Sequence, residues 1–143
     1  MIKLKILAIK FKLIGDVAVL VPSLRALREH WPQASLHVLV REEAASVLQN
    51  IPWIQRVWTV PRRVGGAGLP RTLSTIRRLR KEGFDRTVDF EGNDRGAILS
   101  LLIGAKDRLG SLADLGFAGR RWCYTQRVEK AANGIHEVLR DLH

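Results

Sequence analysis

The chain has only one cysteine among its 143 residues, Cys123, so it cannot close a disulfide within itself or bind a metal through several thiolates. It also lacks a run of about 18 uninterrupted apolar residues, which a membrane-spanning helix requires. Its apolar opening is interrupted by Lys10, Lys12 and Asp16, and no small-residue cleavage site follows, which excludes a secretory signal peptide. These absences predict a cytoplasmic protein.

Acidic and aromatic residues are also scarce. Lysine and arginine number 24 against 14 aspartates and glutamates, which gives a formal net charge of +10. This excess favours an anionic partner, namely a nucleic acid, a membrane surface or a phosphorylated substrate; a basic surface without a specific partner is the alternative. Aromatic residues make up only 6% of the chain. Proteins that bind single-stranded nucleic acids stack bases on aromatic rings, so the composition argues against nucleic acid.

The opening segment has the pattern of a strand followed by a helix. Residues 3–9 predict a buried strand, Gly15 and Asp16 mark the turn after it, and apolar residues then recur at helical spacing up to Trp31. Proline lacks a backbone N–H and clashes with the preceding turn. We therefore expect a short first turn from Asp16 and a longer helix that restarts near Pro22.

Strand and helix patterns alternate along the rest of the chain. The patterns predict strands at 35–40, 56–60, 84–90 and 106–109, and helices at 42–49, from Leu69 to a terminal Gly83, and at 94–103. Residues 122–128 fit a further strand, and an amphipathic pattern starts at Ile135. Glycines 65, 66 and 68 form neither of the usual phosphate-binding motifs and predict a mobile loop. The four histidines have no metal-ligand spacing, so no metal site is expected.

This alternation predicts an α/β fold, a Rossmann-like parallel sheet with helices on both faces, in one domain over residues 1–143. In such sheets ligands bind at the carboxyl ends of the strands, and this places Asp16, Arg62 and Arg95 near one edge. The last helical pattern continues to His143 without a glycine or proline to end it. We therefore expect the chain to be a fragment of a longer protein.

Four motifs, in this order, resemble the amino-terminal domain of the glycosyltransferase family 9 heptosyltransferases. They are Lys10 ahead of the pair Gly15-Asp16; Pro22 with the helical stretch Leu24–Leu27; the strand with Phe84, Asp85, Val88, Asp89 and Gly92; and His136-Glu137-Val138. The resemblance covers nearly the whole chain. One departure is Glu91, where the family commonly has glutamine.

The resemblance implies a GT-B glycosyltransferase, with two Rossmann-like domains that face each other across a cleft. Such enzymes need no metal and invert the sugar carbon. This chain would be the acceptor-binding domain, and the carboxyl-terminal donor-binding domain would be missing, which leaves the isolated chain inactive. The resemblance implies no cofactor, a nucleotide sugar such as ADP-heptose as co-substrate, and an anionic lipid-linked acceptor of the lipopolysaccharide core. It also implies peripheral contact with the anionic inner face of the inner membrane.

The same resemblance implies roles for individual residues. Asp16 would be the catalytic base, because an inverting transfer needs one group to take the proton from the attacking hydroxyl; its alternative role is an N-cap that contributes roughly 1 kcal/mol. The remaining candidates would bind the acceptor, and for the basic ones a solvated surface position is the alternative. They are Lys10, Lys12, Gly15, Arg62, Arg63, Asn93 and Arg95. The competing hypothesis for the whole chain is a non-catalytic basic Rossmann-like module that binds a nucleotide, nucleic acid or anionic membrane.

Overall fold

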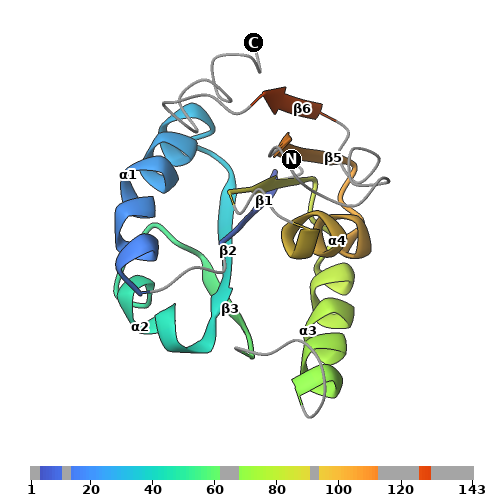
Figure 1. Cartoon of the computed structure of the whole chain (residues 1–143). Helices are drawn as coiled ribbons and strands as arrows, with labels where there is room; N and C mark the ends of the chain where they lie inside the picture. The colour runs from blue at the N-terminus through green and yellow to red at the C-terminus, as the bar shows by residue number, and fades with distance from the viewer. Residues whose placement is uncertain (1–3, 11–13, 62–67, 91–93, 113–125, 130–143) are drawn as a thin grey trace.

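The computed structural model describes residues 4–10, 14–61, 68–90, 94–112 and 126–129. Strands and helices alternate through these residues, as the sequence predicts (Figure 1). The elements are β1 (Lys5–Ile9), α1 (Ile14–His30), β2 (Ser35–Arg41), the 3-10 turn η1 (Glu42–Ala44), α2 (Ala45–Leu48), β3 (Arg56–Val60), α3 (Leu69–Glu82), β4 (Arg86–Asp89), α4 (Asp94–Ile103), β5 (Asp107–Leu112) and β6 (Gln126–Glu129).

The six strands form one sheet in the order β3-β2-β1-β4-β5-β6, and every neighbouring pair is parallel. This confirms the predicted α/β fold with a Rossmann-like parallel sheet. The order runs outward from β1 in both directions, so the chain changes direction between β1 and β4. In open parallel sheets this switch point opens a crevice at the carboxyl ends of the strands, where ligands bind.

The helices cover the two faces of the sheet as separate layers. Successive strand residues point to opposite faces, so Ile6 and Ala8 of β1 pack beneath α1 and α2, while Leu7 and Ile9 pack beneath α3 and α4. Figure 1 shows the sheet between these layers, with α1 and α2 on the left and α3 and α4 on the right. Burial on both faces explains why the central strand β1, with the sequence KILAI, is almost wholly apolar.

Helix α1 corrects one expectation. It runs without interruption from Ile14 to His30 with Pro22 inside it, so the predicted break is wrong. A proline within a helix costs about 3 kcal/mol. Two residues of the same helix, Leu24 and Leu27, are fully buried against the sheet, and each contributes roughly 2 kcal/mol. Because Pro22 itself lies on the exposed side, the packing of α1 outweighs the local penalty.

Other boundaries differ by a few residues. The expected helix at 42–49 is divided into η1 and the single turn α2, and β4 is shorter than the strand expected at 84–90. Of the strand expected at 122–128, residues 126–128 are described and belong to β6. Strand β5 is longer than expected and extends to Leu112. Helix α3 ends as predicted, because Gly83 adopts a left-handed conformation with φ of 74°. Glycines 65 and 66 and the amphipathic pattern from Ile135 lie outside the described residues.

A buried histidine joins β2 to β3 beneath α3. Trp58 Nε1 donates to His37 Nδ1 at 3.0 Å, and His37 Nε2 lies 3.2 Å from Ser35 Oγ. An indole N–H can only donate, so Nδ1 accepts and the proton of the neutral ring is on Nε2. Burial is the main cause that lowers the pKa of His37 below its ordinary value of 6.5, and Lys5 and Arg56 act in the same direction against Glu82.

We predict that this histidine makes the stability of the fold fall in acid. Its pKa is lower in the folded state than in the unfolded state, so the unfolded chain binds the proton more readily. The contribution of neutral His37 to the free energy of unfolding is therefore complete above pH 6.5. It is lost as the pH falls below that value toward the pKa of His37 in the folded protein. His37→Gln keeps an acceptor for Trp58 and should flatten this part of the curve of unfolding temperature against pH. Equal slopes for wild type and His37→Gln would contradict the assignment.

Candidate functional site at the carboxyl edge

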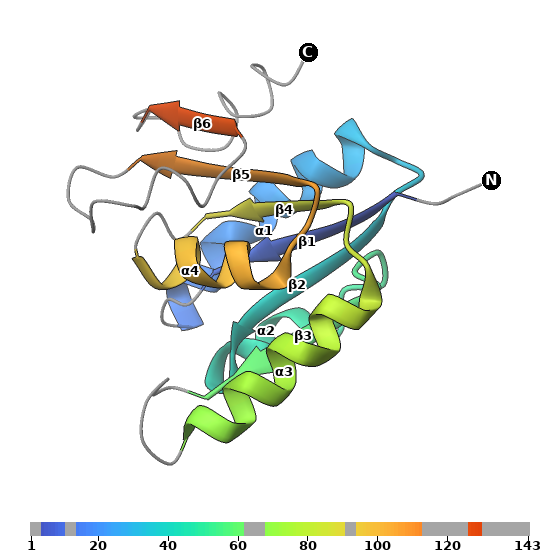
Figure 2. The ribbon, with the colours of Figure 1, turned by 90° about the vertical axis from the view of Figure 1, so that its right-hand side faces the viewer.

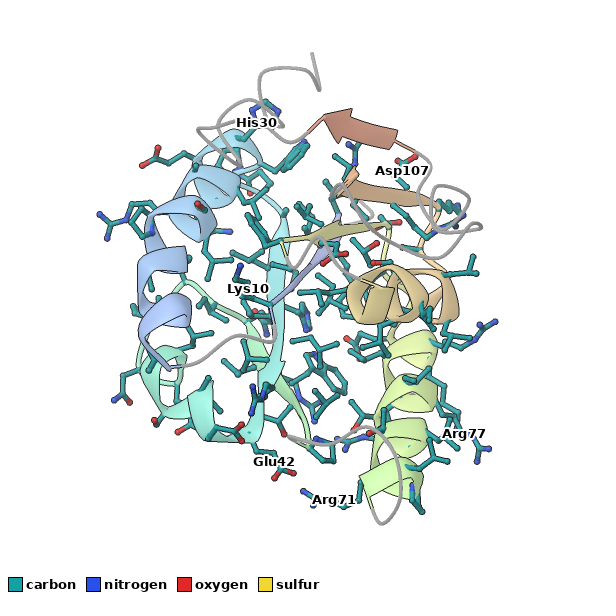
Figure 3. All side chains as sticks on the ribbon, in the orientation of Figure 1. Lys10, His30, Glu42, Arg71, Arg77 and Asp107 are labelled. Carbon is teal, nitrogen blue, oxygen red and sulfur yellow. The ribbon has the colours of Figure 1, made fainter. Side chains whose placement is uncertain are left out.

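The switch point between β1 and β4 holds a fixed positive charge. Ile9 lies opposite Asp89 in the parallel ladder, and Phe90 N donates to Ile9 O at 3.0 Å just beyond it. The side chain of Lys10, the residue after β1, extends to Phe90, the residue after β4. Its Nζ donates to Phe90 O at 3.2 Å. Figure 3 shows Lys10 at the middle of the molecule, between the two helical layers. Lys10 therefore lies at the carboxyl end of β1, at the switch point, and its role in binding the acceptor stays a prediction.

Asp89 is a further charged residue at this point, and it was not among the candidates. It is the last residue of β4 and is only 4% exposed. Aspartate is almost never buried without a partner, so a carboxylate at the end of a central strand indicates a polar site. The available signal was its position, because Asp89 interrupts the apolar sequence between Val88 and Phe90.

Asp16 and Gly15 lie in the first turn of α1. This helix begins at Ile14, which makes Asp16 its third residue, and the alternative role as N-cap stays a prediction. A negative charge in the first turn is favourable beside the positive end of the helix dipole. Only four residues separate the carboxyl end of β1 from α1, so Asp16 stays at the same edge of the sheet as Lys10. Its role as catalytic base stays a prediction.

Arg95 occupies the corresponding position after β4. It is the second residue of α4, which starts at Asp94, so α1 and α4 begin at the same edge, after the two neighbouring strands β1 and β4. The backbone therefore brings the segments of Asp16 and Arg95 to one side of the switch point. The other predicted candidates lie outside the described residues; they are Lys12, Arg62, Arg63 and Asn93.

An open polar pocket of about 250 Å³ lies further along the same edge, between the end of β3 and the first half of α3. Arg71 pairs with Glu42, which directly follows β2, and Figure 3 shows these two side chains close together. Because both are largely exposed, the pair adds little stability, and Arg71 can exchange Glu42 for another anion. The pocket is lined by Glu42, Thr59, Pro61, Arg71, Ser74, Thr75 and Arg78.

The second arginine of the pocket is held by an aromatic ring. The guanidinium of Arg78 lies 5.4 Å from the ring centre of Trp58, and that of Arg56 lies 3.9 Å from it. Trp58 is in turn fixed by its hydrogen bond to His37. A guanidinium held in this way loses less conformational freedom when it binds a ligand. The pocket therefore presents two arginines and three hydroxyl groups but only one carboxylate. This lining suits the binding of an anionic group such as a phosphate.

No metal site is indicated in the part of the chain that the structure describes. There, no three histidine, cysteine, aspartate or glutamate side chains come together as a possible metal site. Among the same residues, none of the helices combines the length and the apolar character needed to cross a membrane.

The fold is the one found in several solved glycosyltransferases, although the sequence matches no protein-family model and no curated protein. A glycosyl transferase of family 9 from Veillonella parvula superposes with a TM-score of 0.79 at 19% identity, over 96% of this chain and 40% of its own. The E. coli heptosyltransferase WaaC with ADP-2-deoxy-2-fluoro heptose gives a TM-score of 0.77 at 18% identity, over 97% and 47%. E. coli ADP-heptose lps heptosyltransferase II gives 0.71 at 20% identity, over 89% and 35%.

The chain shares their fold. This agrees with the resemblance that the four sequence motifs carry. The chain spans less than half the length of each of these structures.

We predict that the pocket at the end of β3 binds inorganic pyrophosphate through its arginines. Arg78→Gln should weaken binding about fivefold to tenfold, because a charge-assisted hydrogen bond is lost. Glu42→Gln should strengthen it, because the competing carboxylate beside Arg71 is removed. Isothermal titration of the two variants against wild type measures both effects. Arg25→Gln, on the exposed side of α1, changes the net charge equally and should leave the affinity unchanged; an equal loss in that control would mean that only overall charge matters.

Proposed function

We propose that this chain is the acceptor-binding part of an inverting glycosyltransferase of the heptosyltransferase type. The likeness to solved family 9 structures supports a glycosyltransferase role. The observation that carries the finer proposal is the switch point, where Lys10 lies at the ends of β1 and β4 while Asp16 and Arg95 follow the same two strands. These residue types suit an acceptor that carries phosphates or carboxylates and presents a nucleophilic hydroxyl.

In the proposed reaction, the acceptor oxygen attacks the anomeric carbon of the donor sugar. Asp16 accepts the hydroxyl proton as the new glycosidic bond forms and the bond to the nucleoside diphosphate breaks on the opposite face. Lys10 would act as a point charge that holds an acidic group of the acceptor. The remaining candidates would bind the acceptor; they are Lys12, Gly15, Arg62, Arg63, Asn93 and Arg95.

The donor would be bound by a second domain outside this chain. One WaaC structure holds ADP and another ADP-2-deoxy-2-fluoro heptose, and we propose an ADP-activated heptose for this protein as well. The acceptor would be a lipid-linked sugar of the lipopolysaccharide core, and the enzyme would work in the cytoplasm at the inner membrane, without a cofactor. The structural likeness does not favour the alternative of a non-catalytic binding module.

The role of Asp16 can be tested in a protein that joins this chain to its donor-binding domain. Asp16→Asn keeps the size of the side chain but removes the base, so we expect kcat to fall by about 10² to 10⁴ with little change in unfolding temperature. Asp107→Asn is a matched control, because Asp107 begins β5 at the opposite edge of the sheet. If Asp16→Asn transfers sugar at the wild-type rate, Asp16 is not the base.

We further predict that the chain of residues 1–143 alone does not transfer sugar. Stabilisation of the departing diphosphate and closure around both substrates would come from the second domain. Weak acceptor binding should remain, because its proposed contacts lie within this chain. A transfer assay with ADP-heptose and deacylated core acceptor, together with calorimetry of each ligand, measures this. Turnover by the isolated chain, or tight binding of the donor without the acceptor, would overturn the proposed division of roles.

A further inference from the structure

The large apolar side chains that the described part of the protein exposes are gathered on one side. They belong to α3 and α4 alone, and each is between 40% and 54% exposed. Residues 21–30 of α1, helix α2 and the described connections between the elements expose no such residue. The exposed residues are Leu69 and Leu73 of α3 and Ile98, Leu101 and Leu102 of α4. Scattered apolar residues need no explanation, but a group confined to one layer marks an interaction surface.

The exposed apolar residues occupy one face of each helix: Leu69 and Leu73 are spaced i, i+4 on α3. Ile98, Leu101 and Leu102 have the i, i+3, i+4 spacing of one helix face, while Leu99 and Ile103 of the same helix are buried against the sheet. Arg80 of α3 joins the helices, because its Nη1 donates to Leu102 O at 2.6 Å. Figure 2 looks onto this side of the molecule and shows α3 and α4 side by side in front of the sheet.

The same side is strongly basic. Helix α3 carries a single acidic residue, Glu82, and that carboxylate is engaged by Lys5 at 3.0 Å. In Figure 3, Arg77 points away from the sheet on this side. The exposed cations of α3 are Arg71, Arg77, Arg78, Arg80 and Lys81. We call the surface formed by Arg77 and the five exposed apolar residues the α3–α4 face.

We propose that the α3–α4 face docks onto an anionic phospholipid membrane. Aliphatic side chains beside cations suit the boundary between acyl chains and acidic headgroups, where apolar groups insert and each nearby cation adds attraction. A second copy of this chain fits less well, because a symmetric contact would bring the cations of two α3 helices together without acids to neutralise them. Single-stranded nucleic acid also fits less well, since the exposed apolar residues are aliphatic and offer no ring for base stacking.

The position of the face relates it to the carboxyl edge. Helices α3 and α4 both begin at that edge, so a protein lying on this face would hold the switch point beside the membrane. This assignment deepens the membrane contact of the proposed function by naming the surface that makes it, and its test requires no sugar transfer and no role for Asp16. If both proposals hold, the docked protein would meet a lipid-anchored acceptor without extracting it from the bilayer.

Co-sedimentation of the 143-residue chain with lipid vesicles tests the proposal. We expect binding to phosphatidylcholine vesicles that contain about one quarter phosphatidylglycerol, weak binding to pure phosphatidylcholine, and a steep loss as ionic strength rises from about 0.05 to about 0.5 M. Arg77→Glu should lower the affinity about tenfold. Arg25→Glu makes the same charge change on the exposed side of α1 and should have a much smaller effect.

Leu101→Ser tests the apolar contribution separately. It removes an exposed side chain, so the unfolding temperature should stay near that of wild type while vesicle binding falls severalfold. Equal losses in Arg77→Glu and Arg25→Glu, or no loss in Leu101→Ser, would overturn the α3–α4 face as the docking surface. Light scattering that shows a dimer broken by Leu101→Ser, without vesicle binding by wild type, would replace the membrane with a second copy. Asp16→Asn should bind vesicles like wild type, which separates this result from the test of catalysis.

Discussion

The structure depends on the pairing of β1 with two strands at once. Its residues align in parallel with β2 on one side and with β4 on the other, and from Ile6 to Ile9 they are almost completely buried. After β1 the chain adds β2 and β3 on one side of it and then returns to add β4 on the other side. The helices are therefore divided, with α1 and α2 on one face of the sheet and α3 and α4 on the other. The same pairing places the ends of β1 and β4 together and thereby creates the crevice. A slip of this register by one residue would turn every core side chain of β1 to the wrong face.

The fold class could be predicted because its signals are local. Residues 56–60 and 94–103 match β3 and α4, since apolar runs bounded by turn residues define such elements. Pro22 was misread for the opposite reason. Its penalty is local and visible in the sequence, whereas the compensating burial of Leu24 and Leu27 exists only once α1 lies on the sheet. The division of 42–49 into η1 and α2 is likewise a matter of tertiary packing.

The candidate site could be predicted only in part. Lys10 follows an apolar strand directly, and in the structure it lies at the switch point, while its binding role stays a prediction. The polar pocket was missed, because Glu42 and Arg71 are far apart in sequence and come together only when α3 packs beside the end of β2. The basic segment around α3 was noted, but spacing alone does not separate Arg78, which lines the pocket, from Arg77, which faces away. That distinction needs the helix to be docked.

The contact between Lys10 and Phe90 also has a consequence for the order of folding. It spans 80 positions of the chain, whereas the pairings of β1 with β2 and of β2 with β3 join positions that are much closer in sequence. Contacts between distant positions form late, because a long loop must close before they contribute. During synthesis, the half of the domain up to β3 can therefore assemble while β4 is still absent. The crevice is completed only when β4 inserts beside β1, so the ligand-binding edge is the last part of the sheet's centre to be built.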